Sequence, residues 1–264
     1  MPEINYHRAG SGPPLLLMHG IGMSWQAFKA VLPRLEAERD VIAIDLPGFG
    51  RSPRPPDGTP AGAATLSRLV IELLDELGLE RPHVAGNSLG GRISLELAKA
   101  GRASTATALS PAGFVQGREQ LLLRASLIGT YEGGRAISRY AGPLTATAVG
   151  RTLLGWHMFQ RPWRCDPADM AEAFRTVADA TWFIETMHTL LTDQFSGGEQ
   201  ISVPVTIAWG QHDRLLLLRQ APRAGAAIPH AKLVTLYGCG HVPMTDDPEQ
   251  VARVLLEGSS VEPL

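Results

Sequence analysis

The sequence lacks the features that mark disulfide-rich, membrane-spanning or secreted chains. Only two of its 264 residues are cysteines, Cys165 and Cys239, and they lie far apart without a CxxC pattern. We therefore expect two reduced thiols. No apolar run approaches the roughly 18 residues needed to cross a bilayer. The opening stretch MPEINYHRAG has no apolar signal core, so we expect a cytoplasmic location.

An excess of charge of one sign is also missing. The chain has 24 basic and 26 acidic side chains, a formal net charge of −2, and no long run of lysine or arginine. This balance argues against a nucleic-acid or anionic-membrane partner. The histidines show no metal-ligand spacing, so neither a metal nor a cofactor is expected. A small-molecule substrate is the expected partner, and the composition leaves a homodimer open.

Apolar residues make up 44% of the chain, enough for one large domain or for one domain with a sizeable insertion. Apolar runs that favour buried parallel strands alternate with helical patterns. The expected strands are 13–20, 40–48, 83–88, 105–111, 203–210 and 231–238, with an antiparallel edge strand near the start. The expected helices are 24–38, with Ser24 as N-cap, 65–78, 89–101 and 247–258. This alternation predicts an α/β fold with a mainly parallel sheet.

One stretch, 112–200, interrupts this alternation. It contains no convincing strand, and within 166–195 apolar residues recur mostly every three or four positions, as in a helix. It also carries ten of the sixteen aromatic residues of the chain. We therefore predict a core domain formed by 1–111 and 201–264, and a helical cap domain formed by 112–200.

The segment GNSLG, 86–90, places a lone serine between glycines at the end of a predicted strand. It fits the pattern G-x-S-x-G in the strand–turn–helix context that the pattern requires. A sharp turn into a helix strains the backbone of the turn residue, and glycines at 86 and 90 avoid a collision. The hydroxyl of Ser88 would then stand at the carboxyl edge of the sheet as a nucleophile.

A serine nucleophile needs a base, and the base needs an orienting acid. Asp213 follows the predicted strand 203–210, and His241 follows the last predicted strand. Side chains just beyond parallel strands converge on one crevice. The order Ser88, Asp213, His241 is that expected for this class of triad. Backbone N–H groups of Ile21 and Leu89 would form the oxyanion hole.

The motifs HGIG, DLPGFGRS, GNSLGG, GQHD and GCGHVPMTDDPEQV occur in an order and spacing that resemble the α/β-hydrolase family. The resemblance covers nearly the whole chain. It implies an eight-stranded, mostly parallel sheet; about seven strands are visible here, so the first is missing. It also implies that 112–200 is a helical cap over the active site, inserted after the sixth strand.

Neighbouring polar residues have more ordinary interpretations. His19 is expected to shape the oxyanion loop rather than to act as a base. Asp45 is expected to hold its loop, and Asp246 and Asp247 to cap the last helix. Cys239 is expected to be a buried packing residue rather than the nucleophile.

GNSxGG resembles the carbon–carbon hydrolases that cleave meta-cleavage products, but Val242 follows the histidine where those enzymes carry tryptophan. We therefore favour a serine hydrolase acting on a small, largely apolar carboxylic ester, with Trp182, Phe183 and Val242 as candidate pocket residues. Alternatives are carbon–carbon bond hydrolysis, a lyase or cofactor-free oxygenase using the same pocket, and a receptor-like binding protein.

Overall fold

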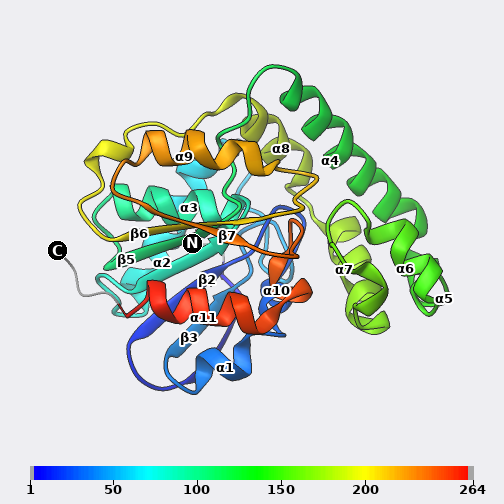
Figure 1. Cartoon of the computed structure of the whole chain (residues 1–264), viewed down its shortest axis with the longest axis horizontal. Helices are drawn as coiled ribbons and strands as arrows, with labels where there is room; N and C mark the ends of the chain where they lie inside the picture. Colours follow the sequence, from blue (N-terminus) through cyan, green and yellow to red (C-terminus); the bar gives the residue numbers. More distant parts are fainter. Residues whose placement is uncertain (1–2, 261–264) are drawn as a thin grey trace.

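The computed structural model describes residues 3–260 and consists of a central sheet between two layers of helices (Figure 1). Within those residues the sheet has seven strands in the order β1-β3-β2-β4-β5-β6-β7. The strands are β1 (Tyr6–Gly10), β2 (Pro14–Met18), β3 (Asp40–Ile44), β4 (His83–Asn87), β5 (Thr105–Leu109), β6 (Val205–Gly210) and β7 (Lys232–Leu236). The predicted fold class, a mostly parallel sheet flanked by helices, is confirmed.

The strand register explains the apolar runs. Strands β2 to β7 pair in parallel, and only β1 runs antiparallel, with Tyr6 opposite Ile44 of β3. Strands β5 and β6 are buried along their whole length. Helices cover both faces of these strands, so apolar side chains are buried on each face. Their carboxyl ends therefore share one edge of the sheet, where the polar residues of the sequence motifs follow.

The flanking helices form two apolar clusters, one on each face. Helices α2 (Ala63–Glu76), α3 (Leu89–Lys99) and α9 (Ala221–Ala227) contribute to one cluster, and α1 (Leu32–Glu36) and α11 (Pro248–Gly258) to the other. The single helix expected over 24–38 is wrong: a 3-10 helix, η1 (Trp25–Phe28), precedes α1, and Ser24 makes no side-chain capping bond. Pro33 has no N–H to continue a helix and stands instead at the start of α1.

The strand-free stretch forms helices α4 (Arg118–Ile137), α5 (Ala141–Thr145), α6 (Ala148–Gly155), α7 (Pro167–Asp179) and α8 (Phe183–Thr192). Figure 1 shows them together at one side of the sheet, with α4 as a long outer helix. They lie between β5 and β6, so their predicted place after the sixth strand is wrong. The predicted position was counted on the eight-stranded pattern of the family. In this chain the insertion follows the fifth strand, β5.

The remaining elements are short. They are the 3-10 helices η2 (Ser138–Tyr140), η3 (Pro162–Arg164), η4 (Gly198–Gln200) and η5 (Leu218–Gln220), and the helix α10 (Pro243–Asp246). No helix within residues 3–260 combines the length and the apolar character needed to cross a membrane.

Hydrogen bonds and ion pairs, among them those of the buried Arg92 and the buried Glu119, tie the insertion to the rest of the chain. The N–H of Phe195 donates to the carbonyl of Gly113 at 3.0 Å, so the two ends of the insertion lie side by side. The buried Arg92 of α3 donates to the carbonyl of Asp193 at 3.2 Å. At the start of α4, the side chain of Glu119 binds two arginines that follow β6, Arg223 and Arg219. The Arg223 guanidinium, aided by Arg219, lowers the pKa of Glu119 to about 2. The division into core and cap domains stays a prediction, and the ends of its ranges, 1–2 and 261–264, lie outside the described residues.

Candidate active site

The turn from β4 into α3 holds Ser88 in a strained backbone conformation. Its φ is 56° and its ψ is −112°, in the region that L residues rarely adopt. A Cβ atom on Gly86 would lie 2.3 Å from the carbonyl carbon of Gly90, and one on Gly90 would lie 1.9 Å from the carbonyl oxygen of Met18. Larger residues at either position would therefore collide with backbone. The steric argument for the glycines of the motif matches these contacts.

Asp213 and His241 are brought into contact from two different strand ends. The Nδ1 atom of His241 lies 2.8 Å from Oδ2 of Asp213, and both side chains are almost fully buried. The other carboxylate oxygen, Oδ1, accepts hydrogen bonds from the N–H groups of Leu215 at 2.9 Å and Leu216 at 2.8 Å. These bonds fix the carboxylate, so Nδ1 of His241 carries the proton and Nε2 is free to accept one.

Ser88 and His241 line one small cavity of about 20 Å³. Residues that are mostly apolar complete its wall: Gly20, Ile21, Met23, Leu127, Met158, Phe183 and Leu215, with Thr130 as a further polar side chain. Leu127, Thr130, Met158 and Phe183 belong to the insertion, which therefore closes the space above the serine. Within residues 3–260, no hydrogen bond joins the Ser88 hydroxyl to His241 in this state, and such contacts often tighten only when substrate binds.

The backbone near Ser88 offers two free donors. Within the described part of the chain, the N–H groups of Ile21 and Leu89 donate to no other protein group. The adjacent His19 is fully buried: its Nδ1 lies 2.6 Å from the carbonyl of Gly20, and its Nε2 accepts from the N–H of Leu46 at 2.9 Å. Burial lowers the pKa of His19, so the ring is neutral and holds the loop, as expected.

The loop that carries His241 is held from several sides. Asn87 donates from Nδ2 to the carbonyl of His241 at 2.9 Å. The carbonyl of Met158, in the insertion, accepts from the N–H groups of His241 at 2.9 Å and Val242 at 3.1 Å. Sequence reasoning missed both supports, because nothing local in the sequence indicates which distant backbone groups will meet.

Asp246 has a role different from the one expected. Its carboxylate accepts from the N–H groups of Gly240 at 2.8 Å, Gln160 at 2.9 Å and Arg161 at 2.9 Å, so it joins the His241 loop to the insertion. Only Asp247 caps α11, accepting from the N–H of Gln250 at 3.0 Å. The expectation that both carboxylates cap the last helix is therefore wrong for Asp246, whose side chain faces the preceding loop.

Other nearby groups fit structural roles. The Asp45 carboxylate accepts from the N–H groups of Trp25 at 2.7 Å and Arg51 at 2.8 Å, and so holds its loop. Both cysteines are free and buried. Burial raises the pKa of Cys239 to about 12, which leaves it a poor nucleophile. Among residues 3–260, no group of three or more His, Cys, Asp or Glu side chains could hold a metal ion.

The three candidate pocket residues lie in different places. Phe183 lines the cavity at Ser88, and Val242 lines a neighbouring cavity. Trp182 lines neither of these cavities. It is 1% exposed and packs so tightly on Gly48 that a Cβ there would lie 2.4 Å from the Trp182 Cβ. Sequence reasoning missed Thr130, whose hydroxyl is 3.0 Å from Nε2 of His157.

Comparison with known proteins identifies the family. A model described as "Alpha/beta hydrolase family" matches residues 15–254. The chain belongs to this family. It is 32% identical over 262 residues to an uncharacterized protein of Mycobacterium tuberculosis (strain ATCC 25618 / H37Rv), covering 94% of this chain and 75% of the relative.

Two further comparisons concern hydrolases. This α/β-hydrolase superposes on the crystal structure of an enol-lactonase from Burkholderia xenovorans LB400 with a TM-score of 0.78 and 19% identity, covering 98% of this chain and 97% of the other, which supports the fold alone. It is also 39% identical over 99 residues to a 2-hydroxy-6-oxo-2,4-heptadienoate hydrolase of Pseudomonas putida (strain ATCC 700007 / DSM 6899 / JCM 31910 / BCRC 17059 / LMG 24140 / F1), over 36% of each chain.

Proposed function

We propose that this α/β-hydrolase is a serine hydrolase that cleaves a small, largely apolar carboxylic ester through an acyl-enzyme. The observation that carries the proposal is the arrangement around one cavity: the strained Ser88 and the His241–Asp213 pair. The N–H groups of Ile21 and Leu89, which have no protein acceptor among residues 3–260, add the donors that a tetrahedral intermediate needs. The reaction uses side chains and backbone of this chain, and we propose no metal or cofactor for it.

In this mechanism the Ser88 hydroxyl oxygen attacks the ester carbonyl carbon, and its proton passes to Nε2 of His241. The carbonyl oxygen becomes an anion that the Ile21 and Leu89 N–H groups stabilise. The intermediate collapses, the ester C–O bond breaks, and His241 protonates the departing alcohol. Water then attacks the acyl-serine, gives a proton to His241, and the serine is regenerated when that proton returns. Asp213 keeps the ring oriented and stabilises its cation throughout.

One observation favours a second candidate, the hydrolysis of a carbon–carbon bond. The relative named 2-hydroxy-6-oxo-2,4-heptadienoate hydrolase is 39% identical to part of the chain, although that part is only 36% of it. Such a substrate carries a carboxylate. Among the residues that the structure describes, those lining the Ser88 cavity include no arginine or lysine to bind it, and so we place ester hydrolysis first.

The test is a covalent label together with turnover. A fluorophosphonate probe should add one adduct to the wild-type chain, and peptide mass spectrometry should locate it on Ser88. Ser88→Ala should lose the adduct and cut the kcat for p-nitrophenyl acetate by on the order of 10⁶-fold. Ser67→Ala, which removes a buried serine hydroxyl of α2, serves as the matched control and should keep both. Turnover by Ser88→Ala within tenfold of wild type would refute the nucleophile, and turnover of a dienol acid but no ester would favour the second candidate.

A further inference from the structure

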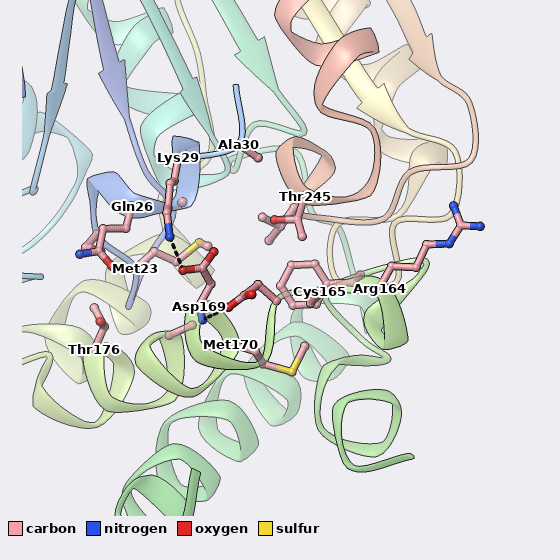
Figure 2. Close-up of a pocket in the computed structure, with 16 residues that line it drawn as sticks. Met23, Gln26, Lys29, Ala30, Arg164, Cys165, Asp169, Met170, Thr176 and Thr245 are labelled. Carbon is pink, nitrogen blue, oxygen red and sulfur yellow. Dashed lines mark hydrogen bonds and ion pairs between the residues drawn. The ribbon is translucent and has the colours of Figure 1, made fainter. Parts of the chain in front are cut away.

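The cavity at Ser88 is too small for an ester. Its volume of about 20 Å³ is enough for roughly one water molecule. A second cavity of about 250 Å³, here called the side cavity, lies between residues 23–30 of the sheet domain and α7 of the insertion (Figure 2). Its size approaches the lower end of the range for small-molecule sites, about 300 Å³. Any substrate part larger than the reacting group must be housed somewhere, and this space is adjacent.

Two backbone segments separate the cavities. Met158 and His241 line the Ser88 cavity, whereas the residues that directly follow them, Phe159 and Val242, line the side cavity. The two segments are held together, because the carbonyl of Met158 accepts the N–H groups of both His241 and Val242. This part of the dividing wall is therefore a hydrogen-bonded backbone that a substrate cannot push aside without moving the catalytic histidine.

Among residues 3–260, Met23 is the one residue that lines both cavities. Its sulfur lies close to the serine: a Cβ built on Gly20 would be 3.4 Å from Sδ of Met23 and 3.3 Å from Cβ of Ser88. A methionine side chain has three rotatable bonds and fills irregular space adaptably. Rotation of this side chain would join the two cavities while the backbone wall stays in place.

We propose that the side cavity binds the hydrophobic part of the ester and that Met23 is the gate between that part and Ser88. The proposal rests on the proposed ester hydrolysis and names where its substrate is housed. The cavity, and not the space directly above the serine, then sets the length of chain that the enzyme accepts.

The lining of the side cavity indicates an uncharged group. Ala27, Phe159, Met170 and Val242 supply apolar surface. The charges near its mouth are already paired or acidic: Lys29 Nζ lies 2.7 Å from Oδ1 of Asp169, as Figure 2 shows. Asp166 lies next to this pair, because its carboxylate accepts the N–H of Asp169 at 3.0 Å. Figure 2 shows the guanidinium of Arg164 pointing away from the cavity. An anionic substrate tail would meet two carboxylates, so we assign a neutral alkyl chain or a single ring.

Two substitutions fill the side cavity from opposite walls. Ala173→Phe adds a ring from α7, and Ala27→Phe adds one from η1. Ala168→Phe makes the same change on α7 at an exposed position that does not line the cavity, and is the matched control. Met23→Ala removes the gate. For each variant, kcat/KM is measured with p-nitrophenyl acetate, butyrate and hexanoate, and with ethyl, butyl and hexyl acetate, so that chains on either side of the ester are sampled.

Wild type should gain about fourfold in kcat/KM for each methylene that the cavity buries, in at least one of the two series. Ala173→Phe and Ala27→Phe should each remove at least tenfold of that gain with the six-carbon chain and change kcat/KM for ethyl acetate, the smallest ester of the set, less than about twofold. Met23→Ala should raise the ratio of kcat/KM for the six-carbon ester to kcat/KM for the shortest ester of the same series. Ala168→Phe should match wild type.

The inference is overturned if both filling variants leave the chain-length profile unchanged, or if they lower all six esters by one common factor. A wild-type enzyme that turns over no ester and takes no fluorophosphonate label refutes the proposed function itself, and the inference with it. If the wild-type enzyme is active and the filling variants keep its chain-length profile, the inference alone is refuted.

Discussion

Replacing Asp213 by asparagine should leave the fold in place and put the proton of His241 on the wrong nitrogen. One carboxylate oxygen of Asp213 accepts from the N–H groups of Leu215 and Leu216, and the other faces Nδ1 of His241. An amide can keep its oxygen on the two backbone donors only if its NH₂ group faces Nδ1. Nδ1 must then accept, the ring proton moves to Nε2, and Nε2 can no longer take the proton of Ser88.

The geometry also sets how strongly this orientation is preferred. Turning the amide by half a rotation would restore the useful tautomer, but it would aim the NH₂ group at two N–H donors. Each buried donor left without a partner costs about 1–3 kcal/mol, so the productive orientation lies roughly 2–6 kcal/mol higher. The variant also loses the charge that stabilises the imidazolium. We therefore expect kcat to fall about 10⁴-fold, which corresponds to about 5.5 kcal/mol.

The assay compares kcat and KM for p-nitrophenyl acetate, with thermal unfolding measured in parallel. Asp247→Asn is the matched control, since Asp247 caps α11 and asparagine caps helices nearly as well as aspartate. Wild-type-like turnover is expected for this control. If the kcat of Asp213→Asn stays within tenfold of wild type at an unchanged unfolding midpoint, another group orients His241 and the tautomer argument is refuted.

Two further predictions concern contacts between the insertion and the site. Asp246→Asn should lower kcat and cost about 1–3 kcal/mol of stability, because an amide cannot accept all three backbone N–H groups on Asp246; unchanged kcat and unfolding midpoint would contradict this. Burial, with a smaller contribution from the neighbouring His241, lowers the pKa of His157 to about 4. The unfolded chain then binds the extra proton first, so stability should fall as pH drops from about 6.5 towards 4, by at most about 3 kcal/mol. His157→Gln should flatten that slope in pH-dependent unfolding, whereas His188→Gln, at an exposed position of α8, should not.

The fold could be predicted because each parallel strand is marked by its own residues. Apolar runs such as 203–210 are buried on both faces, and the glycines flanking Ser88 are required by backbone contacts within a few residues of the turn. Local sequence carries such information directly. The pairing of Asp213 with His241 also follows from the strand ends, since neighbouring parallel strands β6 and β7 deliver both residues to one edge.

The errors had two origins: a proline whose effect on the helix the apolar pattern does not show, and contacts between distant segments. Pro33 divides the helical stretch after Ser24, and the hydrophobic pattern alone gave no sign that the first part would be a 3-10 turn. Trp182 was expected in the pocket because it is aromatic and lies in the strand-free segment, yet it packs closely on Gly48 and is buried. Burial of a large side chain against a particular glycine is a property of the packed core, and no periodicity encodes it.

The contribution of the insertion to the site could be predicted only in part: Phe183 lines the Ser88 cavity as expected, whereas the hydrogen bonds to the His241 loop could not be foreseen. A strand-free aromatic segment suggests a cover over the pocket, but the insertion holds the His241 loop with backbone groups: the carbonyl of Met158, and the N–H groups of Gln160 and Arg161 that donate to the Asp246 carboxylate. Every residue offers a backbone carbonyl acceptor and every residue except proline a backbone N–H donor, so the side chain gives no sign of such a contact. The insertion thus holds the His241 loop through its backbone, and we propose that it contacts substrate through its side chains. Substitutions that alter only its side chains can therefore change chain-length preference while the His241 loop keeps its support.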